Sequence, residues 1–206
     1  NWLETKANPD QPFFMNIWFN EPHATLAAPD EITSNYGDLK DEAAIYSATI
    51  DNTDRAIGRL VAKLKETGKL DNTVIIYSSD HGSYRADRNG GLKGNKGSNF
   101  QGGLRSPGIF FWPDGVRGGR IESTPSGAVD LLPTICGLAG IDKPKGVHLD
   151  GSDLSPLLIE KGTFKRSQPM LWLAPSSGHL ATLREGNYTP VSYTHLTLPT
   201  RDDVEF

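Results

Sequence analysis

Hydrophobic and polar positions form short blocks along the chain, and the apolar blocks have the length of strands. Apolar runs cover residues 13–19, 74–77 and 108–112, and each is long enough for one strand but too short for a helix. The run at 74–77 has no charged position, which predicts a strand buried on both faces. The run at 13–19 follows Pro12 and also predicts a buried strand.

Helical spacing is clearest over residues 38–67. Apolar positions in this segment recur on one face, and Gly68 provides a natural end because glycine readily adopts the left-handed conformation found beyond helix C-termini. The residues of that face are Ile50, Ile57, Leu60, Val61 and Leu64. A tight turn over residues 69–72 then leads into the strand at 74–77.

The second half of the chain continues the alternation of strands and helices. A helical pattern over 126–138 closes near Gly140, and 151–158 predicts a turn followed by a short apolar helix. Candidate strands follow at 170–173 and 179–183. This order is typical of an α/β fold with a mostly parallel sheet flanked by helices.

Composition restricts the class of protein. The chain has 206 residues, of which 36% are hydrophobic and 22% are charged, as in a globular domain. Its formal net charge is -4 and it has no basic stripe, so nothing indicates a nucleic acid partner. No apolar run approaches the roughly 18 residues of a membrane span. The one cysteine, Cys136, cannot form an internal disulfide.

Four side chains are candidates for chemistry. Asp80 and His81 directly follow a predicted strand, and in open parallel sheets ligands bind beyond the carboxyl ends of the strands. A carboxylate in that place can bind a hard cation. Lys96 lies in a Gly-rich loop over 83–103, where small residues allow an anion to approach closely. His23 follows the first predicted strand and could hydrogen-bond an anion or deliver a proton near neutral pH.

Each of these candidates also has a simpler interpretation. An Asp close to a glycine is common in turns and caps, most loop lysines are solvated, and a lone histidine is more often structural. Among the remaining histidines, His148 lies in a predicted turn and His179 could face a substrate cleft. No role is predicted for His195.

The order of these segments closely resembles the sulfatase family. The most specific stretches are Thr-Val-Ile-Ile-Tyr-Ser-Ser-Asp-His-Gly, which ends at Gly82, and the loop from Lys96-Gly-Ser to Gly-Gly-Leu-Arg-Ser-Pro. Matching segments occur in the family's order at 13–23, 46–60, 71–82, 96–107, 130–134 and 149–151. The resemblance spans about residues 12–188, and so many pieces in one order are strongly specific.

The resemblance implies an alkaline-phosphatase-like α/β fold and hydrolysis of a sulfate ester. In the family a formylglycine hydrate attacks sulfur, while one calcium ion (Ca2+) and basic side chains stabilise charge on the sulfate oxygens. By position, Asp80 and His81 would be metal ligands. Lys96 and His23 would be the catalytic and substrate-binding residues that contact the sulfate, and either could protonate the leaving alcohol. Arg105 would brace the loop.

The chain departs from the family pattern at three places. The nucleophile motif, the paired aspartates of the first strand and an upstream lysine have no counterpart, so we expect a C-terminal fragment that is inactive by itself. Cys136 is not the nucleophile because Gly137-Leu138-Ala139-Gly140 lacks the motif's arginine. His81 stands where many sulfatases have Asn, and nitrogen ligands suit transition metals better than calcium. Gln101 stands where relatives are often acidic.

The same resemblance gives the expected organisation. Residues 1–160 would be the C-terminal part of the sulfatase catalytic domain, and 161–188 the start of a smaller C-terminal subdomain. Residues 189–206 match no family segment and are rich in Thr and Pro. They resemble translated sequencing-adapter read-through, and we hypothesise that this tail is an artefact.

The expected substrate is a sulfated carbohydrate or an aryl sulfate, with the sugar-active relatives favoured over steroid-type ones. Such enzymes are usually exported, so the resemblance implies a periplasmic or extracellular location. Two alternatives within the superfamily stay open: a phosphodiesterase or phosphonate hydrolase, which usually lacks the lysine loop, and a degenerate relative without its nucleophile. A non-catalytic carbohydrate-binding module is disfavoured by the alternation of strands and helices. The oligomeric state is not predicted.

Overall fold

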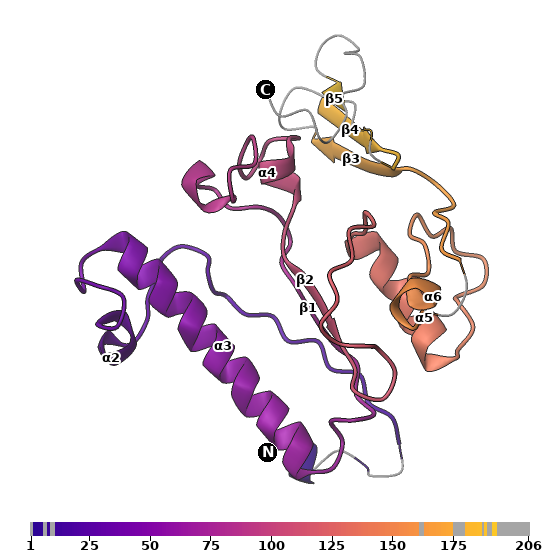
Figure 1. Cartoon of the computed structure of the whole chain (residues 1–206), viewed down its shortest axis with the longest axis horizontal. Coiled ribbons are helices and arrows are strands. Elements are labelled where there is room, and N and C mark those ends of the chain that lie inside the picture. The colour runs from indigo at the N-terminus through magenta and orange to yellow at the C-terminus, as the bar shows by residue number, and fades with distance from the viewer. Residues whose placement is uncertain are drawn as a thin grey trace. The chain divides into compact units, whose positions relative to one another are not determined.

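The computed structural model divides into two compact units, residues 1–73 and 74–206, and each is described by itself (Figure 1). The structure describes residues 2–5, 8, 11–160, 163–174, 180–186, 188 and 191–192. Helices and strands alternate along these ranges, as the hydrophobic pattern predicts.

The first unit is dominated by one long helix, α3 (Glu42–Glu66). The Asp41 carboxylate caps its N-terminus by accepting a hydrogen bond from the Ala43 amide at 3.0 Å. At the other end Gly68 has a φ of 66°, the left-handed conformation that ends many helices. The predicted helix is therefore confirmed, although it begins four residues after Asp38.

The buried face of α3 is narrower than the apolar pattern predicts. Leu64 is buried, but Ile50 is 38% exposed. The other buried positions of the helix are small: Ala44, Ala48, Thr49 and Thr53. The short helices α1 (Trp2–Thr5) and α2 (Asp30–Thr33) each contribute one large apolar side chain to the core of this unit, Leu3 and Ile32.

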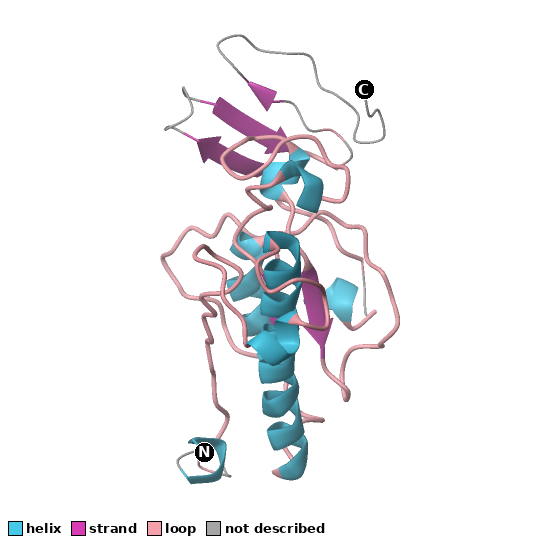
Figure 2. Cartoon of the chain, turned by 90° about the vertical axis from the view of Figure 1, so that its left-hand side faces the viewer, coloured by secondary structure: helices cyan, strands magenta, loops and turns pink. Residues whose placement is uncertain are grey.

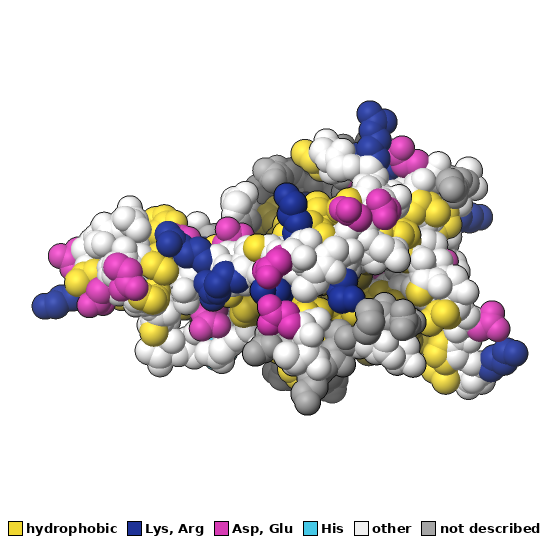
Figure 3. Space-filling model, turned by 90° about the horizontal axis from the view of Figure 1, so that it is seen from below, with side chains coloured by type: hydrophobic (Ala, Val, Ile, Leu, Met, Phe, Trp, Pro, Cys, Tyr) yellow, Lys and Arg dark blue, Asp and Glu magenta, His cyan; other side chains and the backbone are white. Residues whose placement is uncertain are grey.

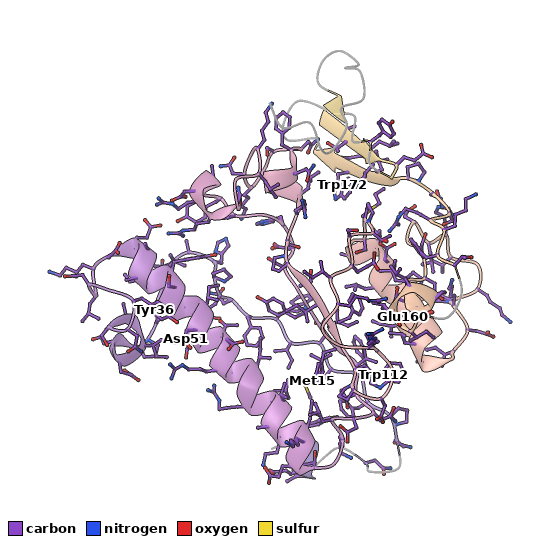
Figure 4. The ribbon with its side chains drawn as sticks, in the orientation of Figure 1. Met15, Tyr36, Asp51, Trp112, Glu160 and Trp172 are labelled. Carbon is purple, nitrogen blue, oxygen red and sulfur yellow. The ribbon has the colours of Figure 1, made fainter. Side chains whose placement is uncertain are left out.

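A hydrogen-bonded group lies on α3 near α2. Asp51 accepts two hydrogen bonds from the Arg55 guanidinium, at 2.7 and 3.0 Å. Desolvation, followed by a hydrogen bond to Asp51, raises the pKa of Tyr36. Tyr36 and Asp51 lie close together in Figure 4. These contacts tie the segment after α2 to the helix.

The prediction of a strand at residues 13–19 is wrong. These residues are extended, but they belong to no strand, and Met15 marks the segment in Figure 4. Phe14 is 75% exposed and Trp18 is 88% exposed. An extended segment becomes a strand only when a neighbour pairs with its amides and carbonyls, and no ladder partner occurs among the described residues.

In the second unit, β1 (Ile75–Ser78) pairs with β2 (Gly108–Phe111). The pairing is antiparallel, with Ile76 opposite Phe110. Both strands form where they are predicted, but β1 is half-buried rather than buried on both faces. The chain between them contains a 3₁₀ turn, η1 (Ala86–Arg88), and the short helix α4 (Gln101–Leu104), and is otherwise loop.

A helical layer follows. It contains η2 (Ala128–Asp130), α5 (Leu131–Ala139) and α6 (Ser155–Leu158), and it confirms both helices predicted in this region. The α5 helix ends at Gly140, whose φ is 65°. Cys136 is buried on α5, which fits its interpretation as a small core residue.

A buried ion pair anchors this layer. The Asp130 carboxylate is fully buried and accepts hydrogen bonds from Arg166 at 2.6 and 2.9 Å. It also accepts the amides of Gly127 and Ser152, at 2.9 and 2.7 Å. Every lone-pair direction of this charge is thus used, as a buried carboxylate requires.

The last described element is a three-stranded sheet of β3 (Met170–Ala174), β4 (Leu180–Arg184) and β5 (Val191–Ser192) (Figure 2). All its ladders are antiparallel, as is the β1–β2 pair, so the described ranges hold no parallel pairing. Both strands predicted in this region form. The domain boundaries expected at residues 160 and 188 stay predictions, and most of the proposed tail lies outside the described residues.

The molecular surface is mixed in character. The face in Figure 3 carries Lys and Arg side chains interspersed with Asp, Glu and hydrophobic side chains. Within the described ranges, no helix combines the length and apolar character needed to traverse a bilayer.

Candidate functional site

The site begins where β1 ends. Asp80 is the second residue beyond the strand, and its side chain is 79% exposed, whereas that of His81 is 37% exposed. Asp80 Oδ2 lies 3.2 Å from His81 Nε2. Asp80 Oδ1 accepts the His81 amide at 3.0 Å and the Ser79 hydroxyl at 3.2 Å. One carboxylate oxygen is thus fixed by the chain, and the other faces the imidazole.

A hydrogen bond to the backbone determines which ring nitrogen of His81 carries a proton. His81 Nδ1 lies 2.8 Å from the Gly82 carbonyl oxygen. A carbonyl only accepts, so Nδ1 carries a proton, and in the neutral ring Nε2 then presents a lone pair. That lone pair faces the lone pairs of Asp80 Oδ2. Two atoms that face each other with lone pairs repel unless a proton or a cation lies between them.

The spacing of these two donors suits a metal ion. The two atoms lie 3.2 Å apart, close enough for both to reach one cation at the roughly 2.3–2.6 Å ligand distances of calcium. No group of three or more His, Cys, Asp or Glu side chains that could hold a metal occurs within the described part of the chain. Asp80 and His81 supply only two ligands, so a metal ion bound between them would need further ligands from elsewhere.

The electrostatics of Asp80 favour its ionised form. Burial opposes ionisation, but the positive charge of His81 when its ring is protonated, the backbone amides and the Ser79 hydroxyl outweigh it, so the pKa of Asp80 lies below its ordinary value. Asp80 is thus a carboxylate at neutral pH, as a cation ligand must be.

Glycines pack the lysine loop against this strand end. The Gly82 amide donates to the Gly103 carbonyl at 3.0 Å. A Cβ atom on Gly82 would collide with the Gly102 carbonyl group, and one on Gly102 would collide with the carbonyls of Leu92 and Gly94. The two segments approach this closely only because neither has a side chain there.

The Lys96 turn is attached to the same strand end. The Lys96 amide donates to the Ser83 carbonyl at 2.8 Å. Two asparagine side chains hold the loop from within: Asn89 Nδ2 donates to the Gly94 carbonyl, and Asn95 Nδ2 donates to the Tyr84 carbonyl, both at 2.7 Å. The structure therefore brings Asp80, His81 and the Lys96 turn into one region, and Lys96 is exposed there.

His23 belongs to the first unit and is described there only. It is exposed, and its Nδ1 lies 2.8 Å from the Ala24 carbonyl oxygen. By the same reasoning as for His81, Nδ1 carries the proton and the neutral ring presents Nε2 outward. The ring is thus oriented by its own loop.

The other histidines and Arg105 do not add ligands to the Asp80–His81 pair among the described residues. His148 Nε2 lies 3.2 Å from Asp150 Oδ1, but both side chains are exposed, and the described ranges offer them no third His, Cys, Asp or Glu ligand. His179 and His195 lie outside the described residues. Arg105 Nη1 donates to Gln101 Oε1 at 3.1 Å across α4, which agrees with a bracing role.

Sequence reasoning missed two supports of the site. The buried Thr182 hydroxyl on β4 donates to the Asn99 carbonyl at 3.0 Å and so connects the lysine loop to a strand 83 residues away. Ser106 Oγ donates to the Ser79 carbonyl at 3.0 Å beside the metal-binding candidates. Thr182 lies in no motif, and Ser106 belongs to the Leu-Arg-Ser-Pro stretch but had no predicted role, so only the tertiary contacts reveal these supports.

Comparison with known proteins adds to this geometry. The sulfatase family model matches residues 1–141. The chain is 31% identical over 173 residues to the uncharacterized sulfatase YdeN of Escherichia coli, and 33% identical over 199 residues to the steryl-sulfatase of Mus musculus. These alignments cover 82% and 92% of this chain but 31% of each relative, so the chain spans about a third of their length.

Solved structures agree. Ps i-CgsB in complex with k-i-k-neocarrahexaose matches 93% of this chain and 44% of its own, with a TM-score of 0.84 and 32% identity. The phosphonate monoester hydrolase SpPMH of Silicibacter pomeroyi matches 76% of this chain and 33% of its own, with a TM-score of 0.60 and 28% identity. The structural matches confirm the predicted α/β, alkaline-phosphatase-like fold class, of which this chain is a part.

Proposed function

The chain belongs to the sulfatase family, and from that premise we propose that this protein hydrolyses sulfate esters. The observation that carries the proposal is the Asp80–His81 pair, whose facing donor atoms lie 3.2 Å apart beside the loop that carries Lys96. A cation site next to an exposed ammonium is suited to an anionic group such as a sulfate.

Asp80 and His81 would hold one calcium ion together with ligands from elsewhere in the protein. When bound, the ion would supply positive charge to the sulfate oxygens, and a formylglycine would supply the nucleophile. The chain's own contribution is orientation: the His81 amide and Ser79 fix one oxygen of Asp80, and the Gly82 carbonyl fixes the ring of His81. These three contacts leave Asp80 Oδ2 and His81 Nε2 facing each other.

Lys96 and His23 would act on the substrate. The Lys96 ammonium would donate hydrogen bonds to sulfate oxygens and stabilise the charge that develops on them. The His23 ring, oriented by the Ala24 carbonyl, would donate a hydrogen bond from Nε2 to a sulfate oxygen when both of its ring nitrogens are protonated. Either group could deliver a proton to the leaving alcohol oxygen, because each carries an N–H group in its protonated form.

The substrate we propose is a sulfated carbohydrate or an aryl sulfate. A sugar substrate is supported by the match to Ps i-CgsB, whose structure contains an oligosaccharide. The match to a phosphonate monoester hydrolase supports a second candidate, hydrolysis of a phosphonate or phosphate ester at the same site. In both cases an anionic tetrahedral group would bind to a metal ion and to a lysine.

The two functions are separated by comparing 4-nitrophenyl sulfate with 4-nitrophenyl phenylphosphonate, using protein expressed from the complete reading frame. Faster release of nitrophenol from the sulfate supports the sulfatase, whereas faster release from the phosphonate supports the second candidate. We propose further that the 206-residue chain alone is inactive, because it lacks a formylglycine motif. Turnover by the purified chain above that of a heat-denatured sample would contradict this.

A further inference from the structure

The loop over residues 83–105 concentrates positive charge. It contains five Lys or Arg residues and one acidic residue, a net charge of +4, whereas the whole chain has a net charge of -4 and the remainder therefore -8. The basic residues are Arg85, Arg88, Lys93, Lys96 and Arg105. Such a local excess attracts anions although the chain as a whole is acidic.

The charges of Lys93 and Lys96 are not neutralised by a carboxylate among the described residues. Arg85 pairs with Asp87, the one acidic residue of the loop, through hydrogen bonds of 2.9 and 3.0 Å. Within the described residues, Lys93 and Lys96 form no ion pair with a carboxylate. The Lys93 ammonium lies 4.2 Å from the centroid of the Phe100 ring. This contact holds the ammonium in place and leaves its charge intact.

Lys93 and Lys96 are fixed to the same strand end. The Lys93 carbonyl accepts the Gly102 amide at 2.8 Å, and Gly102 packs against Gly82. The Lys96 amide bonds to Ser83, the next residue along. Three residues can separate the two lysine Cα atoms by at most about 10 Å. Both lysines thus lie in one short loop that is fixed beside the candidate site.

We propose that Lys93 forms a second sulfate subsite beside Lys96, and that the substrate is an oligosaccharide carrying more than one sulfate group. This inference rests on the proposed sulfatase function, in which Lys96 contacts the sulfate that is removed. An aryl ester with a single sulfate leaves Lys93 without an anion. An oligosaccharide with sulfates on neighbouring sugars supplies one anion to each lysine.

The test compares two carrageenan disaccharides of the same sugar sequence, one carrying a single sulfate and one carrying a sulfate on each of its two sugars. Their binding to the 206-residue chain is followed by the NMR shifts of the amides in residues 83–105. The variants are Lys93→Gln, Lys93→Arg and Lys96→Gln, with Lys143→Gln as a control that removes the same charge from a distant exposed loop. Spectra without ligand verify that each variant keeps its fold.

We expect the doubly sulfated ligand to bind at least about tenfold more tightly than the singly sulfated one, the effect of one added charged hydrogen bond. Lys93→Gln should abolish this preference without changing the affinity for the singly sulfated ligand, and Lys93→Arg should restore it. Equal affinity of the unsubstituted chain for both ligands would overturn the second subsite. A Lys96→Gln variant that binds the singly sulfated ligand normally would instead count against the proposed function, so the two failures are distinguishable.

Discussion

Replacing Gly82 by alanine should disrupt the candidate site by separating its two halves. The added Cβ would collide with the Gly102 carbonyl oxygen, and it would lie 2.8 Å from the Gly102 carbonyl carbon and 3.2 Å from the Arg105 carbonyl oxygen. All three atoms are backbone, so they can move only if the lysine loop moves. The hydrogen bond from the Gly82 amide to Gly103 would be lost or lengthened.

The expected destabilisation follows from these contacts. Overpacking costs about 1–3 kcal/mol, and the loss of one buried hydrogen bond costs about 1 kcal/mol. The lower backbone entropy of alanine in the unfolded state offsets about 0.4–1 kcal/mol of this destabilisation. The net loss in the free energy of unfolding is therefore about 1–3.5 kcal/mol, with a central value of about 2 kcal/mol. Gly108→Ala is the matched control, because a Cβ at that position meets no atom within 4 Å.

The assay is a urea titration followed by the amide signals of residues 83–105, together with hydrogen exchange of the residue 82 amide. Gly82→Ala should lower the midpoint by about 1 M, given a slope of about 2 kcal/mol/M, and should remove the protection of that amide. Gly108→Ala should leave the midpoint unchanged or slightly raised. If the two variants unfold at the same midpoint with the residue 82 amide still protected, the close packing of the glycines does not hold the loop.

Three further predictions concern single side chains. In the complete enzyme, Lys96→Ala should lower turnover by at least about a hundredfold; turnover near that of Lys143→Ala would remove Lys96 from the site. Asp80→Ala should abolish calcium binding together with activity, and titration calorimetry that detects unchanged binding would contradict the metal role. Arg166→Ala should lower the free energy of unfolding by about 3–5 kcal/mol, because it leaves Asp130 buried and uncompensated; a loss below about 1 kcal/mol, as at a surface ion pair, would contradict this. Burial raises the pKa of Asp130, but Arg166 and two amides lower it further, so the net shift is downward. The Asp130 contribution is thus present above the unfolded-state pKa of about 3.9 and lost as pH falls through the lower folded-state value. Stability measured from pH 5 to pH 2 should fall less in Arg166→Ala than in the unsubstituted chain.

Local signals determined much of the fold. The α3 helix has its cap at Asp41 and its stop at Gly68, and each depends on a few neighbouring residues. The strand before Asp80 and the strand at 108–111 are likewise visible as apolar runs. The lysine loop could be anticipated because Gly, Asn and Ser favour turns over regular structure. In each case the energetic preference acts within one turn or one strand.

Partner choice over long distances was not visible in the sequence. The apolar run at 13–19 satisfies every local criterion for a strand, yet it forms none, because pairing depends on a second segment. The antiparallel direction of β1 and β2 is likewise a property of the pair.

The sequence by itself determined which residues could bind a cation or an anion, because the chemistry of Asp80, His81 and Lys96 belongs to their side chains. The tertiary structure decided that Gly82 packs against Gly102, which brings the Asp80–His81 pair and the lysine loop together. Such contacts depend on where two backbone segments that are separated in the sequence meet in space. The conformational preferences of single residues do not determine that meeting point.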